Sequence, residues 1–202
     1  MVLPGIKVAY PMSSNTPIPA APSPIFWGEL APCEHLAQFY EHDAVLLDTL
    51  AGFVGAGLEQ GEGVIVLATG EHLEALAQRL GASGVNLQQA RSQDQYVTVL
   101  AEEALGKFMV NQWPDDQLFV KFVGKLIARA QNGGRRVRAF GELVALLWAR
   151  GDVAATVRLE FLWHQLCHQQ AFSLFCAYPK AGFTEDPLRS LDVIRATHSR
   201  II

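Results

Sequence analysis

One carboxylate stands inside an otherwise apolar stretch of the chain. The segment VRAFGELVALLW, residues 137–148, is largely apolar on both sides of Gly141 and Glu142. Because an unpaired buried carboxylate is destabilising by several kcal/mol, the chain must expose Glu142, pair it or use it. Three roles are therefore open: Glu142 caps the helix that follows, pairs with an arginine such as Arg138, or contacts a ligand.

Two histidines and two cysteines further along the chain could bind a metal or act as a nucleophile. His164 and His168 are four residues apart with Cys167 between them, the spacing of two ligands on one helical face. No second cluster of ligands has a matching spacing, and the apolar face of the same helix lies roughly opposite. We therefore predict solvated histidines and no metal site. Cys176 lies within the apolar run FSLFCAY, where a thiol is usually inert.

The elements that must position these residues alternate along the chain. Apolar β-branched runs predict strands and amphipathic spacing predicts helices, with Asp43 as the N-cap of the first helix. Strands are expected at 35–40, 63–69, 96–101, 135–140 and 172–178, and helices at about 45–58, 71–84, 101–110, 116–131, 152–169 and 187–198. This alternation predicts a three-layer α/β fold, a mainly parallel sheet with helices on both faces.

Open parallel sheets bind ligands at the carboxyl ends of their strands, so the residues at these ends are the candidates. We expect Gly141 to allow a sharp exit from its strand, and Glu142 to turn back toward His35, Tyr40 or His42. Thr69, Gly70, Glu71 and His72 follow another strand and face the same edge. The predicted ligand-binding residues are His35, Tyr40, Glu41, His42, Asp43, Gly141, Glu142, Trp148 and Tyr178. Trp113, Trp148 and Trp163 could line an apolar pocket, although buried aromatic side chains are more often plain core.

Composition restricts the class of protein. The 202 residues are 50% hydrophobic and 18% charged, enough to bury a full core, and the formal charge of -4 disfavours nucleic acid and anionic membranes as partners. Three cysteines without a CxxC motif favour a reducing cytoplasm. No apolar run is long enough for a membrane span, and the first thirty residues lack the charged start and the apolar centre of a signal peptide. We expect a cytoplasmic protein.

The chain divides once, near residue 25. Residues 1–24 contain the proline-rich stretch PMSSNTPIPAAPSP and read as a flexible tail, because they hold too little periodic apolar surface to fold. Ile25, Phe26 and Trp27 follow, and we expect them to dock on the domain formed by residues 25–202.

Several segments of the chain resemble the MEDS domain, a sensory domain named after methanogens, methylotrophs and a dichloromethane-responsive repressor. The resemblance runs from about Trp27 to Ile202, in order, and its segments are HLAQFYEHD, FVGAGLEQGEGVIVLAT, FMVNQWPD, VRAFGELVALLWARGD, LEFLWHQL, FSLFCAYP and HSRII. It implies a signal-transduction module with a RecA-like core related to the circadian clock ATPase KaiC. Domains of this family are often fused to histidine kinases or transcriptional regulators, and hydrocarbon derivatives have been suggested as their ligands.

The residues themselves argue against nucleotide chemistry. A phosphate-binding loop needs glycines, a lysine and a Ser or Thr, but the position after the first strand reads EHDAVLLD. We therefore expect no phosphoryl transfer, no cofactor and no catalysis. The function expected is a sensory domain that binds a small ligand or a signalling protein, such as a histidine kinase or a regulator, with no kinase or helix-turn-helix of its own. The alternatives are a scaffolding module with a vestigial nucleotide cleft and, last, an enzyme that uses Glu142 with a histidine.

Overall fold

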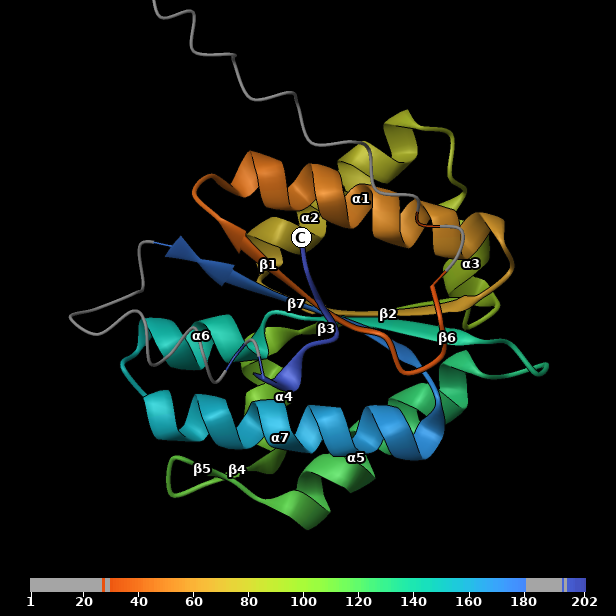
Figure 1. The fold of residues 1–202 in the computed structure, drawn as a ribbon. Coiled ribbons are helices and arrows are strands. Elements are labelled where there is room, and N and C mark those ends of the chain that lie inside the picture. Colours follow the sequence, from red (N-terminus) through yellow and green to blue (C-terminus); the bar gives the residue numbers. More distant parts are fainter. Residues whose placement is uncertain (1–26, 28–29, 181–193, 195) are drawn as a thin grey trace, which may run out of the picture.

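The protein folds around a single parallel sheet of six strands. The computed structural model describes residue 27, residues 30–180, residue 194 and residues 196–202. Strand order is β3-β2-β6-β7-β1-β8, and every pair is parallel (Figure 1). The strands are β1 (His35–Tyr40), β2 (Gly63–Ala68), β3 (Tyr96–Leu100), β6 (Val137–Gly141), β7 (Ser173–Pro179) and β8 (Arg200–Ile201). This architecture confirms the predicted three-layer α/β class and is consistent with a Rossmann-like or RecA-like arrangement.

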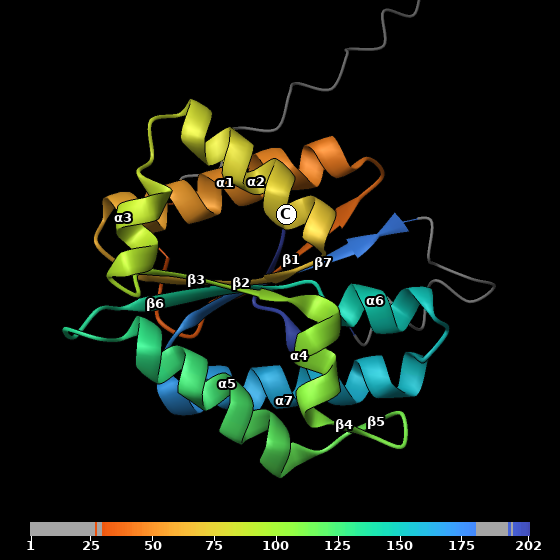
Figure 2. The same cartoon turned by 180° about the vertical axis from the view of Figure 1, so that it is seen from behind.

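Helices cover both faces of the sheet, as Figures 1 and 2 show from opposite sides. One face carries α1 (Asp43–Glu59), α2 (Gly70–Ala82) and α3 (Leu87–Ser92), and the other carries α4 (Ala101–Phe108), α5 (Asp116–Ala130), α6 (Leu143–Ala149) and α7 (Val153–Gln170). Central strands such as β2 are buried along their whole length, which explains their continuous apolar sequence. Two apolar cores result, one between the sheet and each helical layer. None of the described helices could span a membrane.

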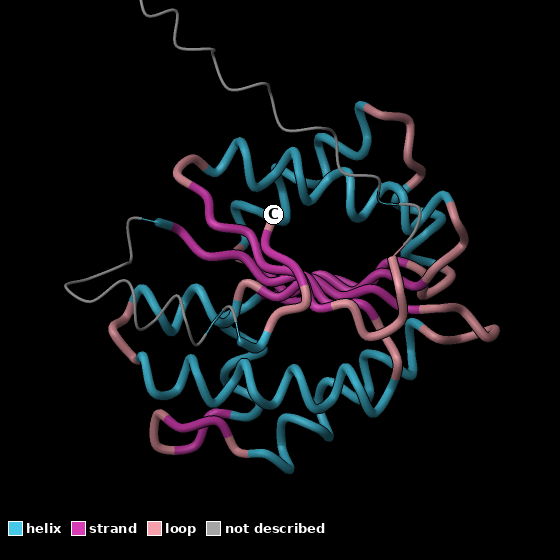
Figure 3. Tube along the Cα trace, viewed as in Figure 1, coloured by secondary structure: helices cyan, strands magenta, loops and turns pink. Residues whose placement is uncertain are grey.

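The connections leave neighbouring strands toward opposite faces. The strands lie between two layers of helices (Figure 3). After β2 the chain enters α2 on one face, whereas after the adjacent β6 it enters α6 on the other. The carboxyl ends of β2 and β6 therefore form a topological switch point, the place where open parallel sheets bind ligands.

Three local features differ from the sequence expectations. Asp43 lies in the first turn of α1, and the N-cap is His42, whose side chain makes no capping hydrogen bond. The expected helix at 101–110 ends at Phe108, because residues 109–114 form an antiparallel hairpin of β4 (Met109–Val110) and β5 (Trp113–Pro114). Asn111 and Gln112 both adopt positive φ, as a two-residue hairpin turn requires. The short α3 and β8 were not predicted, and most of the expected helix at 187–198 lies outside the described residues.

Trp27 docks on the domain as predicted. Its ring packs edge-on against Phe53 at 5.4 Å between centroids and tilts over Phe175 at 6.1 Å. Gly52 leaves the space for it, because a Cβ there would lie 2.8 Å from the indole nitrogen. Residues 1–24, with Ile25 and Phe26, lie outside the described residues.

Candidate functional site

Glu142 lies at the switch point between β2 and β6. Its backbone N–H donates to the carbonyl of Leu67, and its Oε2 accepts a hydrogen bond of 2.9 Å from the backbone N–H of Thr69. The side chain is therefore fastened to the end of the neighbouring strand and is 4% exposed. Although Glu142 occupies the N-cap position of α6, its side chain makes no capping bond. Arg138, the other predicted partner, pairs elsewhere, with Glu62.

His72 bridges Glu142 to a second carboxylate. Its Nδ1 lies 2.7 Å from Oε1 of Glu142, and its Nε2 lies 3.6 Å from Oδ2 of Asp43. Thr69 caps α2 by accepting from the backbone N–H of His72, which fixes this residue in the first turn of the helix. The hydrogen bond to Glu142 raises the pKa of His72, and the charges of Glu142 and Asp43 add to this effect. The arrangement is a histidine held between two carboxylates, one buried and one exposed.

Tyr40 completes the cluster at the end of β1. Its ring is buried, and burial together with the charges of Glu142 and Asp43 raises the pKa of its hydroxyl well above the usual range. The phenol therefore stays protonated and can donate a hydrogen bond. We name Tyr40, Asp43, His72 and Glu142 the edge cluster. It brings together residues from β1, α1, α2 and the start of α6.

The predicted site residues divide into three groups. Tyr40, Asp43 and Glu142 come together in the edge cluster, and His72, which was considered for its position but not selected, joins them. Glu41 and His42 lie beside it but are exposed, and Glu41 pairs with Lys180 at 2.8 Å. Gly141 has no positive φ, and a Cβ there would be in ordinary contact with Trp163 at 3.5 Å, so the expected need for a glycine was wrong.

Three predicted residues do not join the edge cluster. His35 is the first residue of β1 and therefore starts at the opposite end of the strand, so Glu142 does not turn toward it. Tyr178 lies on the face of the sheet that α4 to α7 cover, where its hydroxyl donates to Glu160, and Trp148 packs edge-on against Tyr178 at 6.4 Å. For Tyr178 the alternation of side chains along a strand explains the error, because it turns this residue to the face opposite Tyr40 although both are near the carboxyl ends of their strands.

A buried polar cluster under the sheet escaped the sequence analysis. It joins His35, Glu160, Cys176 and His198, with side chains at most 2% exposed for the two histidines and Glu160. The side of α7 that faces the sheet contains Leu159, Glu160 and Trp163. A carboxylate among apolar residues on this helix face was the signal in the sequence that could have indicated the cluster. His168 is exposed as expected, but His164 is only partly so, and its Nδ1 is buried without a hydrogen-bond partner among the described residues.

Comparison with known protein families agrees with the segments quoted above. The model of the MEDS family, described as methanogen/methylotroph, DcmR sensory domain, matches residues 34–199. The chain belongs to the MEDS family. The MEDS family is a family of sensory domains. The matched residues include every member of the edge cluster and of the buried cluster. No curated protein matches the chain.

The edge cluster predicts a pH dependence of stability in this MEDS domain. Because the folded-state pKa of His72 is raised, its contribution is complete below the unfolded value of about 6.5 and is lost as pH rises through the folded pKa. Unfolding by urea between about pH 5.5 and 9 should therefore show wild type losing stability relative to His72→Gln as pH rises. His42→Gln, at an exposed neighbour, should keep the wild-type profile. Parallel profiles for wild type and His72→Gln would contradict the assignment.

Proposed function

We propose that this MEDS domain is a non-catalytic sensor that binds a small polar ligand, or a signalling partner, at the edge cluster. The observation that carries the proposal is the position of Glu142, a buried carboxylate at the switch point whose two oxygens are bound to different residues of the β2–α2 junction. The exposed side of the cluster is formed by Asp43, whose side chain is 69% exposed. The side chain of His72 is 12% exposed, so a ligand would approach the histidine from the side of Asp43.

The cluster gives such a ligand a route to the helices. Asp43 is in the first turn of α1, His72 is in the first turn of α2, and Glu142 precedes α6. A ligand that hydrogen-bonds to His72 competes with Asp43 or Glu142 for the imidazole. The three helix starts then change their relative stability, and a ligand that prefers one arrangement shifts the population toward it. A histidine kinase or regulator that contacts these helices would receive the signal.

The edge is unsuited to a nucleotide phosphate. The connection from β1 to α1 consists of Glu41 and His42 alone, since α1 begins at Asp43. A phosphate-binding loop surrounds the phosphates with backbone N–H groups and a lysine, whereas this connection is two residues long and carries a carboxylate. We therefore propose a RecA-like core, related to that of KaiC, that has no phosphate-binding loop after β1.

Glu142→Gln tests the proposal directly. The variant keeps an acceptor for Thr69 but loses the charged partner of His72, so we expect a loss of stability of about 1 to 3 kcal/mol. Native mass spectrometry of the purified chain identifies any retained small molecule, and that compound is then added back in thermal melts. The shift it causes in wild type should disappear in Glu142→Gln, and ATP should shift neither protein.

Glu41→Gln is the matched control, because Glu41 lies in the same connection but pairs with Lys180 at the surface. It should melt and respond like wild type. An equal ligand response in wild type and Glu142→Gln would remove the edge cluster from the binding site. Absence of any retained compound, with Glu142→Gln still destabilised, would favour the scaffolding alternative, in which the cluster only holds the helices together.

A further inference from the structure

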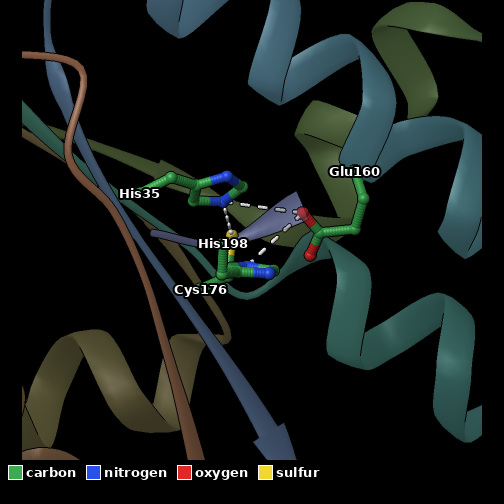
Figure 4. Close-up of side chains that lie close together, drawn as sticks. All are labelled: His35, Glu160, Cys176 and His198. Atoms are coloured by element: carbon green, nitrogen blue, oxygen red, sulfur yellow. Dashed lines mark hydrogen bonds and ion pairs between the residues drawn. The ribbon is translucent and has the colours of Figure 1, made fainter. Parts of the chain in front are cut away.

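The buried cluster under the sheet contains four side chains that could each supply one ligand atom to a metal. His35 comes from β1, Glu160 from α7, Cys176 from β7 and His198 from the residues before β8 (Figure 4). Their ligand atoms all lie within 4.8 Å of one another. The proposed edge cluster uses none of these residues, so a role for them goes beyond the sensor function proposed above.

Three of the six distances between the ligand atoms of the buried cluster match the edges of a tetrahedron around a metal, and the others are at most 4.8 Å. His35 Nε2 lies 3.4 Å from Cys176 Sγ and 3.5 Å from Glu160 Oε2, and His198 Nε2 lies 3.6 Å from the same Oε2. Zinc bonds of about 2.0 to 2.3 Å at tetrahedral angles place neighbouring ligand atoms about 3.3 to 3.6 Å apart. These three distances therefore leave room for a metal ion among the four side chains.

The hydrogen bonds around the cluster turn lone pairs toward its centre. The Nδ1 of His35 lies 2.9 Å from the carbonyl of Thr197, and the Nδ1 of His198 lies 2.5 Å from the carbonyl of Ile194. A carbonyl only accepts, so each Nδ1 is the protonated nitrogen and each neutral ring presents a lone pair at Nε2. Tyr178 likewise donates to Oε1 of Glu160, which leaves Oε2 for the centre. Metal-binding histidines and carboxylates are held by outer partners of this kind.

Two buried polar atoms of the cluster have no hydrogen bond among the described residues. Neither Glu160 Oε2 nor His198 Nε2 has a hydrogen-bond partner among the described residues, although both atoms are buried. Unpartnered buried acceptors are destabilising, and a bound cation would satisfy both at once.

We infer that His35, Glu160, Cys176 and His198 form a binding site for one divalent transition-metal ion of the zinc class. Two imidazole nitrogens, a thiolate and a carboxylate are donors typical of tetrahedral Zn²⁺. Binding releases the thiol proton to solvent, together with any proton on Glu160, while the thiol sulfur bonds to the metal. The thiolate and the carboxylate then cancel the two positive charges, so the buried site is neutral.

Four protein ligands leave no open position, which indicates a structural or regulatory ion rather than a catalytic one. The ion would connect distant parts of the chain. His198 stands two residues before β8, and the other ligands lie on β1, β7 and α7. Metal binding would thus fasten the C-terminal strand to the core beneath the sheet.

Cobalt titration of the purified, metal-free full chain tests this site. Co²⁺ should bind one ion per chain with the visible bands of a tetrahedral complex and a thiolate-to-cobalt charge-transfer band, and Zn²⁺ should displace it. Cys176→Ser should remove the charge-transfer band, while Cys33→Ser and His168→Gln, at a partly buried cysteine and an exposed histidine, should bind as wild type does. Tyr178→Phe, which removes only the outer hydroxyl, should weaken binding about 10- to 100-fold.

Three results would overturn the inference: no cobalt bands in folded wild type, unchanged bands in Cys176→Ser, or loss of the bands in Cys33→Ser. Circular dichroism of each metal-free variant establishes that it is folded. Should Cys176→Ser fail to fold, His198→Gln and Tyr178→Phe decide, because unaltered affinity in both would exclude the site. If the four side chains share a proton and bind no metal, folded wild type shows no cobalt bands, which is the first of these results.

Discussion

Replacing Glu62 with alanine should lower the free energy of unfolding by about 3 to 5 kcal/mol, because it leaves a buried guanidinium without its counter-charge. Arg138 is 1% exposed, and its Nε donates to Glu62 Oε2 at 2.5 Å. Its NH1 donates to the carbonyls of Phe53 at 2.9 Å and Trp27 at 3.3 Å. Those carbonyls satisfy N–H groups but carry no full negative charge. Urea unfolding of wild type and Glu62→Ala measures the difference.

The double variant Glu62→Ala/Arg138→Met separates the cost of a lone charge from the cost of lost packing. A methionine removes the charge and keeps much of the apolar stem, so the double variant should be more stable than Glu62→Ala alone. Glu59→Ala, an exposed carboxylate nearby at the end of α1, should change stability by less than about 0.5 kcal/mol. Equal stability of Glu62→Ala and Glu59→Ala would show that Glu62 does not compensate Arg138.

The packing around Arg138 also explains the neighbouring glycine in α1. A Cβ at Gly57 would lie 2.6 Å from Cδ of Arg138 and 3.0 Å from a methyl group of Val64. The guanidinium also stacks over the ring of Phe53, with 5.2 Å from its carbon to the ring centroid. The arginine is thus enclosed by α1, β2 and Trp27. Because Arg138 belongs to β6 and donates to the carbonyl of Trp27, it connects the docked tryptophan to the centre of the sheet.

The five long strands β1, β2, β3, β6 and β7 were predictable because their signals are local. Short, continuous and β-branched apolar runs such as 63–68 are typical of strands buried on both faces, and glycine marks the nearby helix ends. The hairpin at 109–114 was not predicted because its turn, Asn111–Gln112, lacks the glycine that is typical of such turns. The position of Glu142 at a strand end followed from the same local pattern, and the structure places it there.

The partners of the polar side chains were not predictable in the same way. Glu142 contacts His72, which is seventy residues away in the sequence, and Arg138 contacts Glu62, which is seventy-six residues away. Local spacing drew attention only to His164 and His168, for which we predicted no metal site, whereas the structure gathers His35, Cys176 and His198 around Glu160. Such sets are produced by strand order, which places β1 beside β7 although the two are far apart in the chain. No periodicity in the sequence encodes that order.

Trp163→Ala should lower the free energy of unfolding by about 3 to 5 kcal/mol, because it opens a cavity in the core between α7 and the sheet. The indole ring is fully buried and packs edge-on against Phe119 at 5.0 Å and Phe172 at 6.4 Å. It also lies directly under Gly141, the residue before the proposed ligand-binding carboxylate. A collapse of this cavity would move the end of β6, so any ligand response at the edge cluster should weaken together with stability.

Trp163→Phe distinguishes packing from hydrogen bonding at this position. The indole N–H has no hydrogen-bond partner among the described residues, so phenylalanine removes an unsatisfied donor while it keeps an aromatic ring against Phe119. Trp163→Phe should lower the free energy of unfolding by about 1 to 2 kcal/mol, well below the loss expected for Trp163→Ala. Trp113→Ala, at a tryptophan that is 48% exposed, should cost less than about 0.5 kcal/mol. If the Trp163→Ala variant were as stable as Trp163→Phe, the indole ring would not be filling the core. Trp163 would instead line a space that a ligand can occupy.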